Sequence, residues 1–148
     1  MRILLVDDSL QHRRAGMIQL EALGHEVLAC SGYGDARKAA EAERFDAALI
    51  DLLMPAEATT LGTEARIEHV GREIAIGFPL AIELARLGLP KIAVATDTNH
   101  HNHPMSAVVD WFEGKALTIN GAVVRISHAV LVNDGAKDWA KALADLLQ

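Results

Sequence analysis

Two apolar runs that end on carboxylates constrain this chain more than any other feature. Residues 3–6 (Ile-Leu-Leu-Val) stop at Asp7 and Asp8, and residues 47–50 (Ala-Ala-Leu-Ile) stop at Asp51. Short runs that are apolar throughout are typical of strands buried on both faces, as in a parallel sheet. We therefore expect two central parallel strands that deliver acidic groups to the carboxyl edge of the sheet, where ligands bind in such folds.

Strand and helix signals alternate along much of the chain. Ser9 can cap a helix that Gly24 ends, a second helix follows Asp35, and Pro104 can open a later one. This alternation predicts a doubly wound α/β fold with right-handed crossovers in a single domain, residues 1–148. The five predicted parallel strands are residues 3–6, 25–31, 47–50, 91–96 and 129–133.

Two segments are predicted to be insertions. Residues 56–76 have weak periodicity, and we expect either an ordered functional excursion or a disordered loop there. Residues 115–128 contain Asn120-Gly121, which favours a type I′ hairpin between two β-rich arms. An isolated hairpin is marginal in water, so its apolar side chains should contact a partner or a second copy, or else pack on their own domain.

Composition excludes several classes of protein. The chain has 148 residues, 51% of them hydrophobic and 4% aromatic, which is enough for one core built from aliphatic side chains. A net charge of −6 without a basic run argues against nucleic acid as the main partner. Cys30 is the only cysteine, and there is neither a signal-peptide pattern nor an apolar run of membrane-spanning length. We expect a cytoplasmic protein without an internal disulfide.

The three acids are predicted to share one pocket. In the common strand order 2-1-3-4-5, the first and third strands are neighbours, so Asp7, Asp8 and Asp51 would meet. Like charges at such short range repel unless a cation joins them, and Mg²⁺ prefers oxygen ligands. A carboxylate beside Mg²⁺ can accept a phosphoryl group. The alternative is that these are ordinary strand-end acids that face solvent.

The sequence resembles the receiver domain of two-component response regulators. The motifs that carry the resemblance are ILLVDDS, GHEV, FDAALIDLLMP and IAVAT, and the match is close over residues 1–55. Beyond residue 55 it is limited to the fourth strand, the last strand and the final helix. The resemblance implies a flavodoxin-like sheet of five parallel strands with helices on both faces.

The resemblance also assigns roles to individual residues. It makes Asp51 the phospho-acceptor, with Asp8, Asp51 and the backbone carbonyl of Leu53 holding Mg²⁺. Asp7 would act through the water shell of the ion, and Thr96 matches the hydroxyl residue that follows the phosphoryl group. The implied partners are a sensor histidine kinase or phosphotransfer protein and a downstream protein, and a homodimer of this chain is a further candidate.

Three departures from the family pattern stand out. Receivers usually carry a lysine at the end of the fifth strand, where this chain has Asn133 and Asp134. Lys137 could reach back to the pocket, although a solvated helix residue is the expectation for a lysine there. The aromatic residue usual on that strand is absent from residues 129–133. Asp97 replaces the small residue usual after Thr96 and adds negative charge near the site.

A histidine-rich loop follows the fourth predicted strand. His100, His101 and His103 could contribute to a Zn²⁺ or Ni²⁺ site or contact a phosphoryl group. No cysteine lies nearby and no further ligand is evident from the spacing. The alternative, a solvated or hydrogen-bonded loop, is therefore favoured.

Three functions are compatible with these patterns. The first is a stand-alone receiver phosphorylated on Asp51 with Mg²⁺, which would be no enzyme beyond its own phosphorylation and dephosphorylation. The second is a pseudo-receiver that serves as a binding module without being phosphorylated. The third, a Mg²⁺-dependent phosphohydrolase, is disfavoured because Leu52 and Leu53 follow Asp51 where a paired acid would be needed.

Overall fold

The computed structural model describes residues 1–99 and 101–148 of the chain. Its strands are β1 (Arg2–Val6), β2 (Glu26–Cys30), β3 (Ala47–Asp51), β4 (Met54–Pro55), β5 (Glu73–Ile74), β6 (Lys91–Thr96), β7 (Ala116–Ile119) and β8 (Ala122–His128). Its helices are α1 (Leu10–Ala22), α2 (Tyr33–Ala42), α3 (Thr63–His69), α4 (Gly77–Arg86), α5 (Pro104–Phe112) and α6 (Trp139–Leu146).

The main sheet confirms the flavodoxin-like fold. Its strand order is β2-β1-β3-β6-β8-β7, and every neighbouring pair is parallel except β7 and β8. Its five parallel strands follow the predicted order 2-1-3-4-5, and β7 adds an antiparallel strand at one edge. The short strands β4 and β5 form a separate two-stranded sheet.

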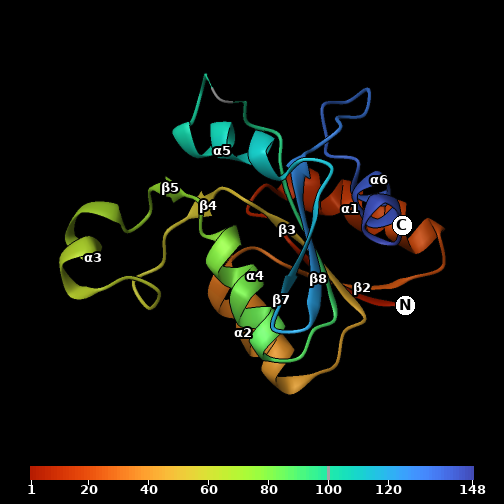
Figure 1. Ribbon diagram of the computed structural model, residues 1–148, viewed down its shortest axis with the longest axis horizontal. Coiled ribbons are helices and arrows are strands. Elements are labelled where there is room, and N and C mark those ends of the chain that lie inside the picture. Colours follow the sequence, from red (N-terminus) through yellow and green to blue (C-terminus); the bar gives the residue numbers. More distant parts are fainter. Residues whose placement is uncertain (100) are drawn as a thin grey trace.

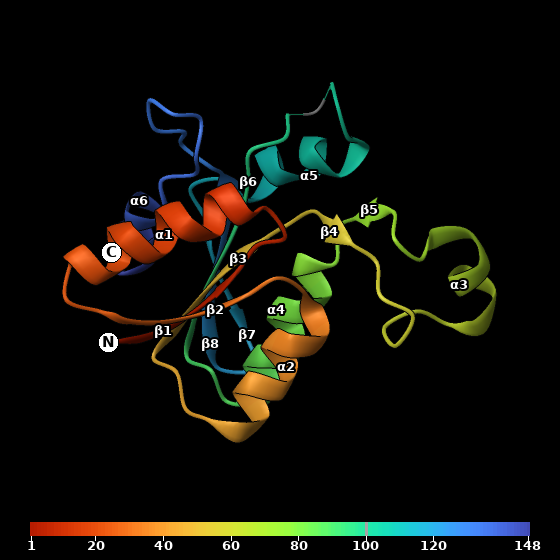
Figure 2. The same cartoon turned by 180° about the vertical axis from the view of Figure 1, so that it is seen from behind.

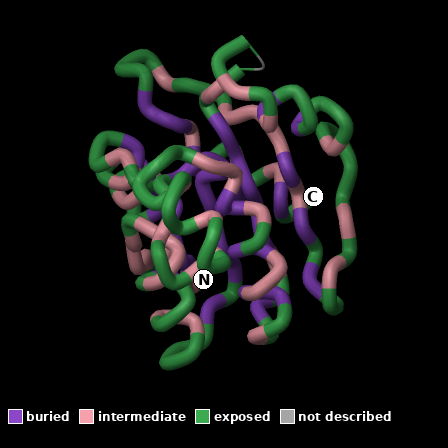
Figure 3. Tube along the Cα trace, turned by 90° about the vertical axis from the view of Figure 1, so that its left-hand side faces the viewer, coloured by how far each residue is buried: buried purple, intermediate pink, exposed green. Residues whose placement is uncertain are grey.

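Helices cover both faces of the sheet, and the central strands are therefore buried on both sides. Figures 1 and 2 show α1 and α6 on one face and α2 and α4 on the other. Alternate residues of β1 separate accordingly: Ile3 and Leu5 pack in the cluster under α1 and α6, whereas Leu4 and Val6 pack in the cluster under α2 and α4. In Figure 3 the buried stretches gather toward the middle of the trace, and many of the outer loops are exposed.

The prediction for the last parallel strand is wrong. Residues 129–133 do not form it; β8 pairs with β6 and is the fifth parallel strand. Its residues Ala122, Val124 and Ile126 are buried, whereas Val130 and Leu131 are about half exposed. The burial of alternate side chains explains why the earlier segment, and not residues 129–133, completes the sheet.

The hairpin exists, but it is not an inserted arm. Asn120 and Gly121 have φ angles of 48° and 83°, as a type I′ turn requires, and they join β7 to β8. Of the two strands within residues 115–128, β8 is itself the fifth parallel strand, and only β7 is additional to the five parallel strands. Leu117 and Ile119 pack against the core, so the alternative that the hairpin covers its apolar side chains with its own domain is correct.

The segment 56–76 is an ordered excursion. It contains α3 and β5, and its two ends are joined by hydrogen bonds from the Ala56 amide to the Arg72 carbonyl and from the Gly71 amide to the Ala56 carbonyl, both 2.8 Å. Helix α3 has no buried residue and projects away from the sheet (Figures 1 and 2). None of the helices in the described part of the chain has the length and apolar character needed to cross a membrane.

Candidate functional site

The predicted acids meet at the carboxyl edge of the sheet. The register pairs Val6 with Ile50, so Asp7 follows β1 beside Asp51, the last residue of β3. Asp7 is fully buried, Asp51 is 5% exposed and Asp8 is exposed. Each of the three side chains offers an oxygen within 4.8 Å of the others. This cluster of Asp7, Asp8 and Asp51 is the acid pocket.

The acid pocket has the donor set that a hard divalent cation requires. In residues 1–99 and 101–148 no other group of three or more His, Cys, Asp or Glu side chains is close enough to hold a metal ion. Carboxylate oxygens, two of them on buried residues, suit Mg²⁺ or Ca²⁺ better than softer metals. The exposed side of the pocket, at Asp8, leaves room for water to complete the coordination sphere.

A lysine lies among these acids. The ammonium nitrogen of Lys137 is 2.8 Å from Asp51 Oδ1 and 2.9 Å from Asp7 Oδ2. Lys137 is fully buried, so the expectation that it is a solvated helix residue is wrong. Lys137, just before α6, therefore supplies the positive charge that the end of the fifth strand lacks in the sequence.

The loop between β8 and α6 brings Lys137 back to the edge of the sheet. Leu131 and Lys137 form an antiparallel bridge, and the Gly135 amide donates to the Val132 carbonyl at 2.8 Å. The ammonium group also lies 5.5 Å from the centre of the Trp139 ring, within the range of a cation–π contact. Trp139 is fully buried and anchors the start of α6.

At each of these groups, burial and the neighbouring charges shift the pKa in opposite directions. Burial raises the pKa of Asp51 to about 8, although the nearby Lys137 lowers it. Burial likewise raises the pKa of Asp7. For Lys137, burial alone would lower the pKa, but the charges of Asp51 and Asp7 outweigh it and raise the pKa above its ordinary value. The ammonium therefore stays charged, and it offsets part of the cost of burying negative charge at Asp7 and Asp51.

Asp97 and His12 extend the network. Asp97 Oδ1 lies 3.1 Å from the Lys137 ammonium, and Asp97 Oδ2 lies 3.4 Å from His12 Nε2. Burial alone would raise the pKa of Asp97, but the charge of Lys137 lowers it below its ordinary value. Asp97 thus adds a negative charge near the site, as expected, and that charge is paired with Lys137.

Thr96 and Leu53 lie at or just beyond the carboxyl ends of the neighbouring strands β6 and β3. Thr96 ends β6, is 1% exposed and accepts a hydrogen bond from the Thr98 amide on its hydroxyl oxygen at 3.2 Å. Leu53 is a buried residue just beyond β3. The family's aromatic residue is also absent from the observed last strand: β8 ends on His128, whose Nε2 lies 2.8 Å from Asp110 Oδ1 on α5.

The described residues of the histidine-rich loop, His101 and His103, are not part of the acid pocket. His103 caps α5, with Nδ1 accepting a hydrogen bond from the Met105 amide at 3.1 Å. The His101 amide donates to Asn99 Oδ1 at 3.0 Å. Neither residue belongs to a metal-type cluster in the described part of the chain, and His100 lies outside the described residues.

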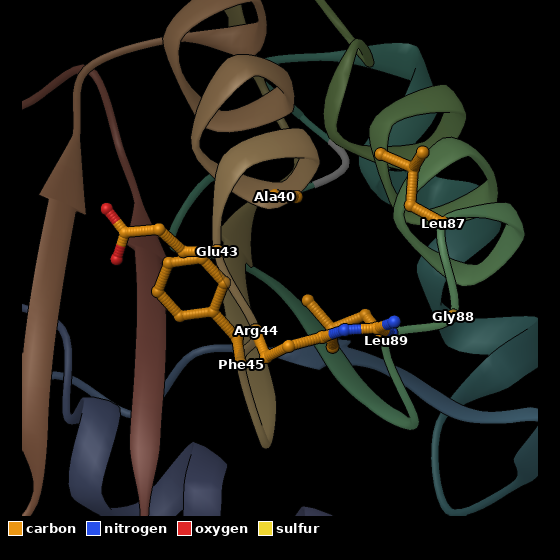
Figure 4. A pocket seen from close by; sticks show the side chains of 7 residues that line it. All are labelled: Ala40, Glu43, Arg44, Phe45, Leu87, Gly88 and Leu89. Carbon is orange, nitrogen blue, oxygen red and sulfur yellow. The ribbon is translucent and has the colours of Figure 1, made fainter.

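A separate small pocket lies at the opposite edge of the sheet. Figure 4 shows it between the end of α2 and the end of α4, lined by Ala40, Glu43, Arg44, Phe45, Leu87, Gly88 and Leu89. Glu43 and Arg44 are its only charged residues. It has no cluster of groups comparable to the acid pocket, which remains the candidate site.

Comparison with known proteins rests on structure, because no family model and no curated protein sequence matches this chain. The response regulator TrrA from Thermotoga maritima, solved in complex with Mg²⁺-BeF, has a TM-score of 0.60 and 21% identity over 99% of this chain and 98% of that one. The fold is that of a receiver domain. Its strand order and its layers agree with the sequence prediction.

Two further structures give the same result. A CheY-like receiver domain protein from Methanospirillum hungatei has a TM-score of 0.58 and 20% identity, over 97% of this chain and 90% of that chain. A response regulator from Burkholderia pseudomallei, solved with a phosphorylated aspartic acid, calcium ion and citrate, has a TM-score of 0.57 and 21% identity. That match covers 98% of this chain and 65% of the other.

Proposed function

We propose that this protein is a response regulator receiver that accepts a phosphoryl group on Asp51 with the help of Mg²⁺. The observation that carries the proposal is the convergence of Asp7, Asp8 and Asp51 with the Lys137 ammonium at the carboxyl edge of a receiver fold. An ordinary set of solvent-facing acids would not place two buried carboxylates within 3 Å of a buried ammonium.

Each side chain has a distinct task in this proposal. An oxygen of Asp51 attacks the phosphorus of an acyl phosphate donor such as acetyl phosphate, in line with the leaving group; the new P–O bond makes an acyl phosphate on Asp51, and the donor leaves as its carboxylate. Asp8, Asp51 and the Leu53 carbonyl would hold Mg²⁺, and Asp7 would act through the water shell of the ion. When bound, the ion would neutralise charge on the transferring phosphoryl oxygens. Water attack on the acyl phosphate later returns Asp51 and phosphate.

Lys137 takes the role for which it was the less favoured candidate in the sequence. Its ammonium already contacts Asp51 and can donate to a phosphoryl oxygen attached there. Thr96 supplies a hydroxyl group at the end of β6 that can follow the phosphoryl group. A receiver without its lysine would be expected to respond weakly to phosphorylation; because Lys137 supplies the ammonium group, we expect no such weakening here.

The solved structures with this fold support the proposal by their ligands. One was solved in complex with Mg²⁺-BeF and another with a phosphorylated aspartic acid and a calcium ion. By analogy, the partners of this chain would be a sensor histidine kinase or phosphotransfer protein and a downstream protein, in the cytoplasm. Its chemistry would be limited to its own phosphorylation and dephosphorylation.

Intact mass after treatment with acetyl phosphate and Mg²⁺ tests the proposal. Wild type should gain one phosphoryl group, and Asp51→Asn should gain none because the amide cannot form the acyl phosphate. Asp145→Asn is a matched control, since Asp145 pairs with Lys141 on the exposed surface of α6. If wild type gains no phosphoryl group, or Asp51→Asn gains it equally, the pseudo-receiver function takes the place of this proposal.

A further inference from the structure

One ammonium group serves three carboxylates in this pocket. Lys137 Nζ lies 2.8 Å from Asp51, 2.9 Å from Asp7 and 3.1 Å from Asp97. Asp7 and Asp51 belong to the acid pocket, but Asp97 does not. Asp97 is therefore a partner of Lys137 that would not also be a ligand of a cation in the acid pocket.

His12 contacts both Lys137 and Asp97. Its Nδ1 accepts a hydrogen bond from the Lys137 backbone amide at 3.2 Å. In a neutral ring the proton must then be on Nε2, which faces Asp97 Oδ2 at 3.4 Å. His12 is 9% exposed and lies on α1, so a helix on one face of the sheet fixes both the backbone of Lys137 and the carboxylate of Asp97.

A divalent cation in the acid pocket would compete with Lys137. The cation would draw on the same two carboxylates that the ammonium contacts, Asp51 as a ligand and Asp7 through its water shell. Two positive groups beside the same carboxylates repel each other, so the ammonium must give up at least part of these contacts when the cation binds. Without another partner, a long flexible lysine side chain would move toward water.

We propose that Asp97, held by His12, is a positioning residue that keeps Lys137 beside Asp51 when a divalent cation occupies the acid pocket. The inference rests on the proposed function and assigns to Asp97 a task within the same site. The ammonium needs no new partner, because it already contacts Asp97. It stays beside Asp51, where it can receive a phosphoryl oxygen, and the cation meets less competition for the acid pocket.

A double-mutant cycle on Mg²⁺ affinity tests this inference without any phosphodonor. Asp97→Asn should weaken Mg²⁺ binding about tenfold, because the ammonium then has only the cation's own ligands as charged partners. In a Lys137→Met background the same substitution should change the affinity less than about twofold. Amide chemical shifts around Asp7 and Asp8 give the affinity in each variant, and Asp145→Asn is the matched surface control.

A second readout follows the ammonium group directly. The ¹⁵N signal of the Lys137 side chain should persist in wild type after Mg²⁺ is added, because the group remains buried and paired. In Asp97→Asn the signal should broaden or disappear with Mg²⁺ as exchange with water increases. His12→Asn, whose side chain is too short to span the same two contacts, should weaken Mg²⁺ binding in the same direction if Asp97→Asn does not fold.

Each outcome separates the two proposals. An equal loss of Mg²⁺ affinity with and without Lys137 would mean that Asp97 acts on the cation directly, which overturns the inference and leaves the proposed function standing. An unchanged affinity in Asp97→Asn also overturns it. If wild type binds Mg²⁺ but is not phosphorylated, only the proposed function fails. If wild type does not bind Mg²⁺ at all, both are wrong.

Discussion

At the scale of single residues, Asp51 is where burial and charge oppose each other most directly. Burial raises its pKa from the ordinary 3.8 to about 8 despite the adjacent Lys137. Between these values the folded protein holds a proton that the unfolded chain releases. The free energy of unfolding should therefore fall as the pH rises from about 4 to about 8, because the unfolded state binds fewer protons in that range.

Denaturant unfolding at about pH 5 and about pH 8.5, in buffer without divalent cations, checks this prediction. Wild type should lose stability between the two, and Asp51→Asn should lose less because its amide does not ionise. Some loss should remain in the variant, since the pKa of Asp7 is also raised by burial. The lowered pKa of Asp97 acts only below its ordinary 3.8, outside this range. Equal losses in both proteins would contradict the assignment.

The acids of the site could be predicted from the sequence, but their lysine could not. Asp7, Asp8 and Asp51 each follow or end a short apolar run, and strand ends in a parallel sheet share one edge whatever the loops do. Lys137 reaches the same edge only through the path of the loop after β8. That path depends on tertiary contacts, among them the hydrogen bond from the Lys137 amide to His12, and no local pattern encodes it.

At the scale of elements, helix α4 begins directly against the backbone of Asp51. The Gly77 amide donates to the Leu52 carbonyl at 3.0 Å. A Cβ at Gly77 would lie 2.0 Å from the Asp51 carbonyl oxygen, far inside contact distance. The absence of a side chain at residue 77 therefore allows α4 to support the strand that carries the proposed phospho-acceptor.

Gly77→Ala should destabilise the protein by about 1–3 kcal/mol, the range for overpacking a close contact, and should shift the amide signals of Asp51 and Leu52. Gly62→Ala is a matched control. Gly62 caps α3 with a φ of −63°, and a Cβ added there would meet nothing within 4 Å. Urea unfolding of both variants checks the prediction. If Gly77→Ala is as stable as Gly62→Ala, α4 can move away from the Asp51 backbone without loss of stability, and the prediction is wrong.

Elements with strong local signals were predicted well, and the choice between two similar segments was not. The type I′ turn at Asn120-Gly121 and the helix beginning at Pro104 occur as expected. Residues 122–128 and 129–133 are both rich in β-branched and aliphatic residues, so either could have been the fifth parallel strand. Pairing with β6 and burial of Val124 and Ile126 decide between them, and both are tertiary effects.

At the scale of the whole molecule, residues 57–70 of the excursion (residues 56–76) stand apart from the main sheet (Figures 1 and 2). Its root is closed by the hydrogen bonds between Ala56 and residues 71 and 72. Glu57 anchors the first part, because its carboxylate accepts from the Gly34 amide at the start of α2, 3.1 Å away. Beyond that anchor, α3 contributes nothing to the core, and its Ile67 is 86% exposed.

Replacing residues 59–68 with a short Gly-Ser linker should leave both the fold and the acid pocket intact. The root hydrogen bonds hold the two ends of the excursion together, so a short connection can join them, and shortening a loop changes the closure free energy by only about 0.6 kcal/mol for each halving. The free energy of unfolding should therefore change by less than about 1 kcal/mol. Amide shifts around Asp7, Asp51 and Thr96 should respond to Mg²⁺ as in wild type. Loss of the Mg²⁺ response in a folded deletion protein would show instead that the excursion acts on the pocket, and unfolding would show that α3 supports the core.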